Sequence, residues 1–174
     1  WDPFTATEMA ELHDFFTFEV AWSPDGSQLA SGNIRDTIRV WDLASGEPQR
    51  EMISRTESEV ISLAWSLDGG ILAAGYLNGD IILWSAASGE RILTIGDYTR
   101  MRSDTNGVAW SLDGTQLVSA HEDGVVRLWD AASGKLLRTL SHGDEVISVA
   151  FSPDGRLLAS GGYDNLIYVW GVIP

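Results

Sequence analysis

The chain has 174 residues, of which 25 are acidic and 11 basic, giving a formal net charge of −14 at pH 7. This length is enough for one domain with its own core, and the strong negative charge disfavours a nucleic-acid backbone or an anionic membrane as partner. The absence of cysteine excludes disulfides and thiolate metal sites. No apolar stretch approaches the roughly 18 residues of a membrane span, and no targeting segment is visible, so we expect a cytoplasmic protein.

The chain opens on Trp1-Asp2, a pair that ends a strand further along the sequence. The interval from Trp1 to Trp22 is nearly the same as the interval from Trp129 to Phe151. We therefore interpret residues 1–12 as the last, outer strand of a sheet, with residues 7–12 as the strand itself.

From residue 18 onward, short β-rich runs alternate with turn dipeptides, a pattern typical of antiparallel strands joined by hairpins. The predicted strands are residues 18–22, 28–32, 37–41, 49–53, 60–65, 71–75, 80–84, 91–95, 107–110, 116–120, 125–129, 135–140, 146–151, 156–160 and 166–170. The last group has three strands and no fourth. Asp-Gly pairs at Asp25, Asp68, Asp113 and Asp154 supply the positive φ that tight hairpins need.

These groups are copies of one another. VAWSPDG at residues 20–26 returns as LAWSLDG, VAWSLDG and VAFSPDG. The aromatic residue of this motif recurs as Trp22, Trp65, Trp110 and Phe151. A second aromatic residue ends each third strand and follows the first at the same interval in every copy, as Trp41, Trp84, Trp129 and Trp170. A period of about 40–45 residues with four strands and a Trp-Asp pair is typical of propeller blades.

On these motifs the chain resembles the WD-repeat β-propeller family, with the Trp-Asp pair kept at Trp41 and Trp129. The resemblance implies an all-β fold of four-stranded antiparallel blades, four per chain. We expect residues 1–174 to form a single module. Its blades are residues 18–53, 60–95, 107–140 and 146–170, and residues 1–12 are the outer strand that closes the ring.

Blade four contains a Ser, a His and an Asp that could be taken for a hydrolase triad: His142, Ser160 and Asp164. Ser160 lies inside a predicted strand, with no elbow to expose its hydroxyl. The resemblance instead implies a buried hydrogen-bond chain of these three residues with Trp170. The other blades depart from this set at the His position (His13, Thr56, Met101), the Ser position (Ser31, Ala74, Ser119) and the Asp position (Arg35, Asn78, Asp123). Those blades must rely more on apolar packing.

In the family, partners usually bind the face formed by the loops that join strand four to strand one and strand two to strand three. Carried over by position, the candidate partner-binding residues are Phe15, Phe16, Arg35, Arg55, Tyr76, Tyr98, Arg100, Met101, Arg102, His121 and Tyr163. These residue types are enriched at interaction sites. The long connection of residues 96–106 supplies four of them, and we expect it to lie at the centre of the surface.

We predict a non-catalytic scaffold that binds a protein or peptide and needs no metal or cofactor. Two alternatives stay open: a regulatory or assembly segment of a larger multidomain protein, and an enzyme that uses the central channel. Four blades are at the low end of propeller sizes. We therefore expect a homodimer that forms one eight-bladed ring by exchanging N-terminal strands, with a closed four-bladed monomer as the alternative.

Overall fold

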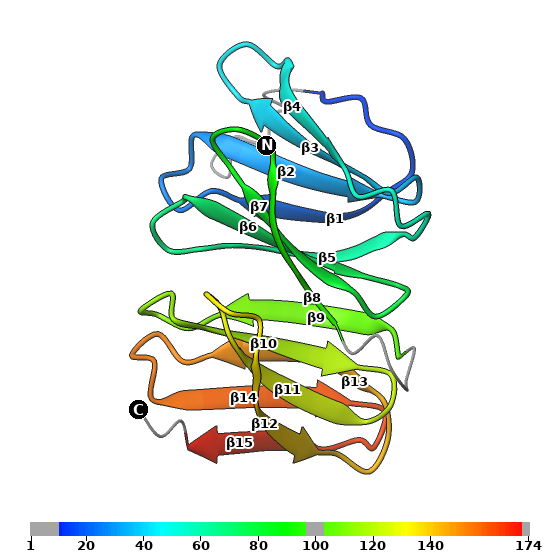
Figure 1. The fold of residues 1–174 in the computed structure, drawn as a ribbon, viewed down its shortest axis with the longest axis vertical. Helices are drawn as coiled ribbons and strands as arrows, with labels where there is room; N and C mark the ends of the chain where they lie inside the picture. The colour runs from blue at the N-terminus through cyan, green and yellow to red at the C-terminus, as the bar shows by residue number, and fades with distance from the viewer. Residues whose placement is uncertain (1–10, 97–102, 172–174) are drawn as a thin grey trace, which may run out of the picture.

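The computed structural model describes residues 11–96 and 103–171, which form fifteen strands in four antiparallel sheets (Figure 1). The strands are β1 (Thr17–Trp22), β2 (Gln28–Asn33), β3 (Thr37–Asp42), β4 (Pro48–Ile53), β5 (Val60–Trp65), β6 (Ile71–Tyr76), β7 (Ile81–Ser85), β8 (Arg91–Ile95), β9 (Thr105–Trp110), β10 (Gln116–His121), β11 (Val125–Asp130), β12 (Leu136–Ser141), β13 (Val146–Phe151), β14 (Leu157–Gly162) and β15 (Ile167–Gly171). Each sheet pairs its strands in chain order. The sheets are the four predicted blades, and the last has three strands within the described residues.

The first hairpin of each blade is held by its Asp-Gly turn. In blade one, Asp25 accepts hydrogen bonds from the hydroxyl of Ser23 (2.7 Å) and from the backbone and hydroxyl of Ser27 (3.0 and 2.8 Å). These bonds lower the pKa of Asp25 to about 2. Gly26 follows with φ +70°, a conformation that side chains disfavour. The turn chemistry thus fixes the register of β1 on β2.

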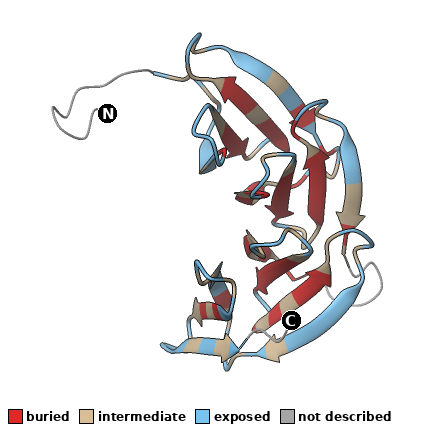
Figure 2. Cartoon of the chain, turned by 90° about the vertical axis from the view of Figure 1, so that its left-hand side faces the viewer, coloured by how far each residue is buried: buried red, intermediate tan, exposed pale blue. Residues whose placement is uncertain are grey.

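The four blades follow one another along an open arc (Figure 2). Their first strands, β1, β5, β9 and β13, contact one another in sequence, so they form the inner side. The fourth strands β4, β8 and β12 lie on the outer side and are largely exposed. The first and last blades remain apart (Figure 2), so a single chain does not form the closed four-bladed ring that was the alternative to the dimer.

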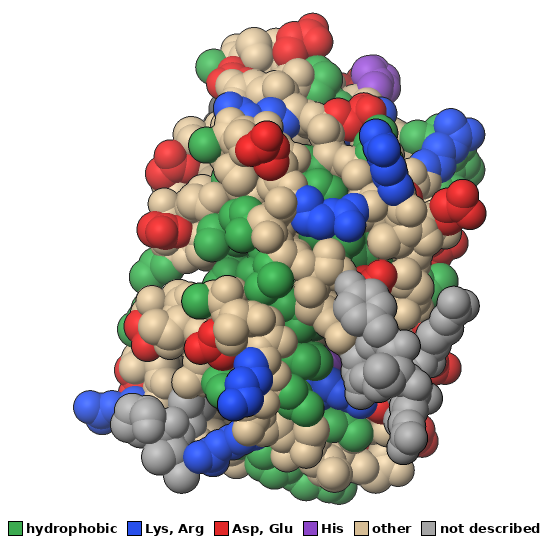
Figure 3. Space-filling view, in the orientation of Figure 1, with side chains coloured by type: hydrophobic (Ala, Val, Ile, Leu, Met, Phe, Trp, Pro, Cys, Tyr) green, Lys and Arg blue, Asp and Glu red, His purple; other side chains and the backbone are tan. Residues whose placement is uncertain are grey.

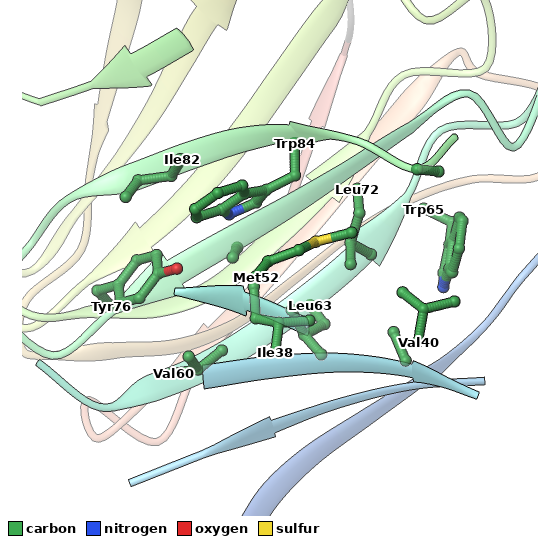
Figure 4. Close-up of a cluster of buried hydrophobic side chains, with 13 residues drawn as sticks. Ile38, Val40, Met52, Val60, Leu63, Trp65, Leu72, Tyr76, Ile82 and Trp84 are labelled. Carbon is green, nitrogen blue, oxygen red and sulfur yellow. The ribbon is translucent and has the colours of Figure 1, made fainter. Parts of the chain in front are cut away.

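Three apolar layers, one between each pair of neighbouring blades, make up the core. In the first layer, Ile38, Val40 and Met52 of blade one pack against Leu63 and Leu72 of blade two (Figure 4). All five are at most 5% exposed. Burying one such side chain contributes about 1.5–3 kcal/mol, so face-to-face packing of blades is the main source of stability.

The expected N-terminal strand, residues 7–12, lies mostly outside the described residues, and Glu11 and Leu12 are not in a strand. Within the described part of the chain, β15 pairs only with β14. Strand β13 is buried on one side only, because Val146 and Val149 are buried whereas Ile147 is 39% exposed. The exposed side is the one that no further blade covers in a single chain.

On the face shown in Figure 3, the Lys and Arg side chains (blue) lie at several separate places, with acidic side chains (red) on the same face. No helix in the described residues is long and apolar enough to cross a membrane.

Candidate binding face

One face of the arc is formed by the loops that precede each first strand and the loops between second and third strands. Side chains join the two kinds of loop. Ser58 accepts a hydrogen bond from the backbone N–H of Asn78 (2.9 Å), and Ser103 accepts one from the backbone N–H of Asp123 (2.8 Å). In blade one, Asp36 accepts a hydrogen bond from the backbone N–H of Thr56 (2.9 Å). We call this surface the loop face; its described residues are 13–16, 34–36, 54–59, 77–80, 103–104, 122–124, 142–145 and 163–166. These bonds fix its loops before any partner arrives.

Blade one presents a compact aromatic and cationic group on the loop face. The guanidinium carbon of Arg35 lies 3.5 Å from the centroid of the Phe15 ring, and the rings of Phe15 and Phe16 pack edge to face at 4.8 Å. Phe15 is 38% exposed and Phe16 69% exposed. Phe16 has φ +43°, an unusual conformation for a bulky residue, and its carbonyl accepts a hydrogen bond from Ile34. The sequence had assigned Phe15, Phe16 and Arg35 to the partner-binding surface.

The other predicted binding residues divide into three sets. Arg55 and Tyr163 are exposed on the loop face. Tyr76 and His121 end the second strands of their blades and are 0% and 4% exposed, because their side chains pack inward rather than toward the loops. We therefore leave these two out of the binding surface. The remaining four, Tyr98, Arg100, Met101 and Arg102, lie outside the described residues.

Beneath the loop face, blade four contains the hydrogen-bond chain that the resemblance implied. His142 Nδ1 lies 3.0 Å from Asp164 Oδ2, and His142 Nε2 lies 2.7 Å from Ser160 Oγ. Ser160 Oγ accepts a hydrogen bond from Trp170 Nε1 at 2.8 Å. Since the indole can only donate, the Ser160 hydroxyl accepts from it and keeps its own proton to share with Nε2, while Nδ1 faces the carboxylate. We call such a Trp-to-Ser-to-acceptor chain a relay.

Two further relays are present that the sequence analysis missed. In blade one, Trp41 donates to Ser31 at 2.8 Å, and Ser31 donates to Asp14, not to the neighbouring His13. Burial acts to raise the pKa of Asp14, but hydrogen bonds from Ser31, Phe15 N–H and Asn33, together with the Arg39 charge, lower it. The acceptor Asp14 follows the expected His13 by one residue, so the position implied by the family pattern predicted the wrong side chain.

In blade three, the side chain that pairs with the relay serine belongs to a strand. Trp129 donates to Ser119 at 2.8 Å, and Ser119 Oγ lies 2.7 Å from Nε2 of His121, the last residue of β10. Burial, and then the Arg127 charge, lower the pKa of His121 to about 4. His121 is therefore neutral at pH 7, as an acceptor of the Ser119 proton must be. The signal in the sequence was the spacing of Ser119 and His121, two residues apart on one face of a strand.

Blade two has no relay, because Ala74 occupies the serine position. Both Trp84 Nε1 and the Tyr76 hydroxyl are buried with no hydrogen-bond partner among the described residues. Burial raises the pKa of Tyr76. Figure 4 shows the Tyr76 hydroxyl pointing toward the Trp84 indole inside the apolar layer.

Family models match the chain along most of its length. A model described as "WD domain, G-beta repeat" matches residues 13–42 and 134–171. A model described as "Anaphase-promoting complex subunit 4 WD40 domain" matches residues 52–103 and 87–151, which together exceed half of the chain. The chain belongs to the WD-repeat family. No curated protein matches it.

WD-repeat domains are typically non-catalytic modules for protein–protein interaction, and the relay residues agree with that role. Ser160 is 2% exposed, and both its hydrogen-bond directions are used within the relay, so a substrate could not reach it. Among the described residues, no three His, Asp or Glu side chains are grouped so that they could hold a metal ion.

The opposite face of the WD-repeat arc has shallow grooves between neighbouring first hairpins. The larger has a volume of about 430 Å³ and is lined by Leu67, Trp110 and Leu112, with Asp68 and Asp113 at its rim. Leu67 is 59% exposed and Leu112 48% exposed. This groove is a second candidate binding surface, which the resemblance to the family did not predict.

Proposed function

We propose that this WD-repeat protein is a non-catalytic scaffold that binds a protein or peptide on its loop face. The observation that carries the proposal is the group of Phe15, Phe16 and Arg35. Large aromatic and Arg side chains dominate the binding energy of protein interfaces, and here they are adjacent and exposed on loops held by internal hydrogen bonds.

The group offers both apolar surface and charge. The Arg35 guanidinium lies over the Phe15 ring and has no hydrogen-bond partner among the described residues, and its charge suits a carboxylate of the partner. A guanidinium already held over a ring loses little side-chain entropy when it binds. Such a site fits a peptide segment that places an apolar side chain next to an acidic one.

We also propose that the protein is not a catalyst. This is supported by the buried Ser, His and Asp side chains that resemble catalytic residues, because they hydrogen-bond to one another and stabilise the blades. The channel-enzyme alternative needs inward-facing polar groups on β1, β5, β9 and β13, where the sequence supplies chiefly Val, Leu, Ala and Trp.

An affinity-capture experiment with matched variants tests the binding surface. The loop-face variant is Phe16→Asn with Arg35→Ser; Asn is chosen because it tolerates positive φ. The control is Leu67→Ser with Leu112→Ser, which alters the opposite groove. We expect a partner that is retained by the wild type and by the control and lost by the loop-face variant. Loss only in the control would move the site to the opposite groove.

We further propose that the working form is a homodimer in which two open arcs complete one eight-bladed ring. It is supported by the large apolar side chains left exposed at the two ends of the arc, such as Trp22 (59%) and Ile167 (81%). Association that buries them makes stability depend on protein concentration. The urea midpoint should therefore rise when the chain is concentrated about a hundredfold; a midpoint that does not change would argue for a monomer.

A further inference from the structure

The two ends of the arc are unlike ordinary surfaces, because each consists of positions that are buried elsewhere in the repeat. We call the side of blade one that faces away from blade two the leading face, and the side of blade four that faces away from blade three the trailing face. Each can be compared, position by position, with the matching faces inside the arc.

The leading face of blade one is the first half of such a comparison. Leu63, Val108 and Val149, at one position of the first strand, are 5%, 7% and 9% exposed. The same position in blade one is Val20, which is 54% exposed. The neighbouring aromatic position shows the same difference in exposure: Trp65 is 9% exposed, whereas Trp22 is 59% exposed.

The trailing face of blade four gives the other half. At one position of the third strand, Ile38, Ile81 and Val126 are all 0% exposed, whereas Ile167 is 81% exposed. Two residues later, the buried side chains of Val40, Leu83 and Leu128 correspond to Val169, which is 65% exposed. The trailing face thus presents the apolar surface against which a leading face packs.

Hydrogen bonds across the interior seams set the register of these contacts. Trp65 Nε1 donates to the carbonyl of Ala21 in the preceding blade at 3.0 Å, and Trp110 Nε1 donates to Ala64 in the same way at 3.0 Å. Between blades two and three, the backbone N–H of Val108 donates to Ser62 Oγ at 3.1 Å. Blades one and two therefore each supply a carbonyl on the trailing face for the next blade, and blade two also supplies a hydroxyl.

The same donors and acceptors are present at the two ends of the arc. On the leading face, Trp22 occupies the position of Trp65 and Trp110, and Val20 that of Val108. On the trailing face, Ala150 occupies the position of Ala21 and Ala64, and Ser148 that of Ser62. Ala150 and Ser148 are exposed.

We infer that the trailing face of one copy takes the leading face of a second copy in the register of the interior seams. This inference rests on the proposed homodimer and specifies its interface. Trp22 Nε1 of the second copy donates to the Ala150 carbonyl, and the Val20 N–H donates to Ser148 Oγ. Ile167 and Val169 pack against Val20 and Trp22, as Ile38 and Val40 pack against blade two.

The occupant is a second copy because both halves of the seam are on this chain and continue an interface that the chain already makes three times. A head-to-tail contact of this type gives a ring if it closes and a filament if it does not. When two arcs meet at both ends, one two-fold axis relates two identical seams. Neither the leading face nor the trailing face of either copy then stays exposed.

A disulfide cross-link tests this register, because the natural chain has no cysteine. The seam variant carries Val20→Cys and Ser148→Cys. The matched control carries Ser62→Cys and Val108→Cys, the same pair of positions inside the arc, where the N–H to Oγ distance is 3.1 Å. After mild oxidation, we expect the seam variant to become a covalent dimer with twice the 19.0 kDa mass of one chain. The control should cross-link within one chain, so its covalent mass stays that of a single chain.

The outcomes separate the seam from the homodimer. One result is that the control cross-links while the seam variant does not, although light scattering gives the mass of a dimer. That result would overturn the register and leave the homodimer standing. A monomer with no cross-link would overturn both, and a ladder of longer covalent chains would overturn two-fold closure. If the control pair fails to oxidise, Trp22→Ala decides: we expect at least a tenfold rise in the dimer dissociation constant, and an unchanged constant would refute the seam.

Discussion

Blades two and four use opposite means to hold the same fold. Blade four has the complete relay of His142, Ser160, Asp164 and Trp170, but one of its faces has no neighbouring blade in the chain. Blade two has no relay and leaves Trp84 Nε1 and the Tyr76 hydroxyl unpaired among the described residues, but it is packed between two neighbours.

The difference indicates that the relay is dispensable where apolar layers cover both faces of a blade. Two buried polar atoms without partners cost about 1–3 kcal/mol each, and the apolar side chains of blade two that are at most 1% exposed offset this cost. A blade at the end of the arc lacks one such apolar layer, so its polar relay contributes a larger share of its stability.

The largest expected effect concerns apolar packing in blade two. Leu72 is fully buried between blades one and two. Leu72→Ala should lower the free energy of unfolding by about 2–5 kcal/mol, through lost burial and the cavity left behind. Urea denaturation measures this loss, and the exposed Leu67→Ala is the control. A loss below about 1 kcal/mol would break the comparison, because packing would then not be what holds blade two.

The relay of blade four comes next in size. His142→Ala, Ser160→Ala and Asp164→Ala should each lower the free energy of unfolding by about 1–3 kcal/mol, because each leaves a buried partner without its hydrogen bond. Arg156→Ala, which removes an exposed side chain of the same blade, is the control. All variants should be compared in samples dilute enough to be monomeric. Unchanged thermal stability in all three relay variants would refute the structural role of the relay.

The relay of blade three predicts a pH dependence. The pKa of His121 is about 4 in the folded protein, below the usual value of 6.5, so between these values the unfolded chain binds a proton that the folded chain does not. Stability is therefore lost as pH falls from about 6.5 toward 4 and levels off below. This histidine should account for about 2 kcal/mol of loss between pH 7 and pH 5. Denaturation of wild type and His121→Gln at both pH values measures it, and equal losses in the two proteins would contradict the assignment.

The smallest effect would come from giving blade two the serine it lacks. Ala74→Ser places a hydroxyl at the position from which Ser31, Ser119 and Ser160 accept the Trp hydrogen bond in the other blades. We expect a gain of about 0.5–1.5 kcal/mol in unfolding free energy if Trp84 Nε1 finds this acceptor. Calorimetry detects such a gain, and destabilisation instead would mean that the apolar layer around Trp84 excludes a polar atom.

Much of the fold could be predicted from the repeat, because the turn dipeptides and the paired aromatic residues fix each blade locally. The strands lie within two residues of their predicted positions; β9, for example, begins at Thr105 rather than at residue 107. The relay of blade four was predictable for the same reason.

Three features were not predictable from the repeat pattern. Asp14, next to the expected His13, accepts the hydrogen bond from Ser31. In blade three the partner of Ser119 is His121 of β10, which is far along the chain from the expected position of Met101. Only the path of the backbone decides which side chain reaches Ser31 or Ser119. The burial of Tyr76 and His121 likewise depends on side-chain direction at the end of a strand. The open arc depends on the angle between neighbouring blades, which no local motif specifies.

The central claim is that the exposed ends of this arc are the two halves of one seam between copies. The molar mass of the wild-type chain in solution tests it most directly, by light scattering across a dilution series. We expect a species of twice the 19.0 kDa mass of one chain, which Trp22→Ala converts to the monomer. A monodisperse 19.0 kDa species at every concentration would contradict it.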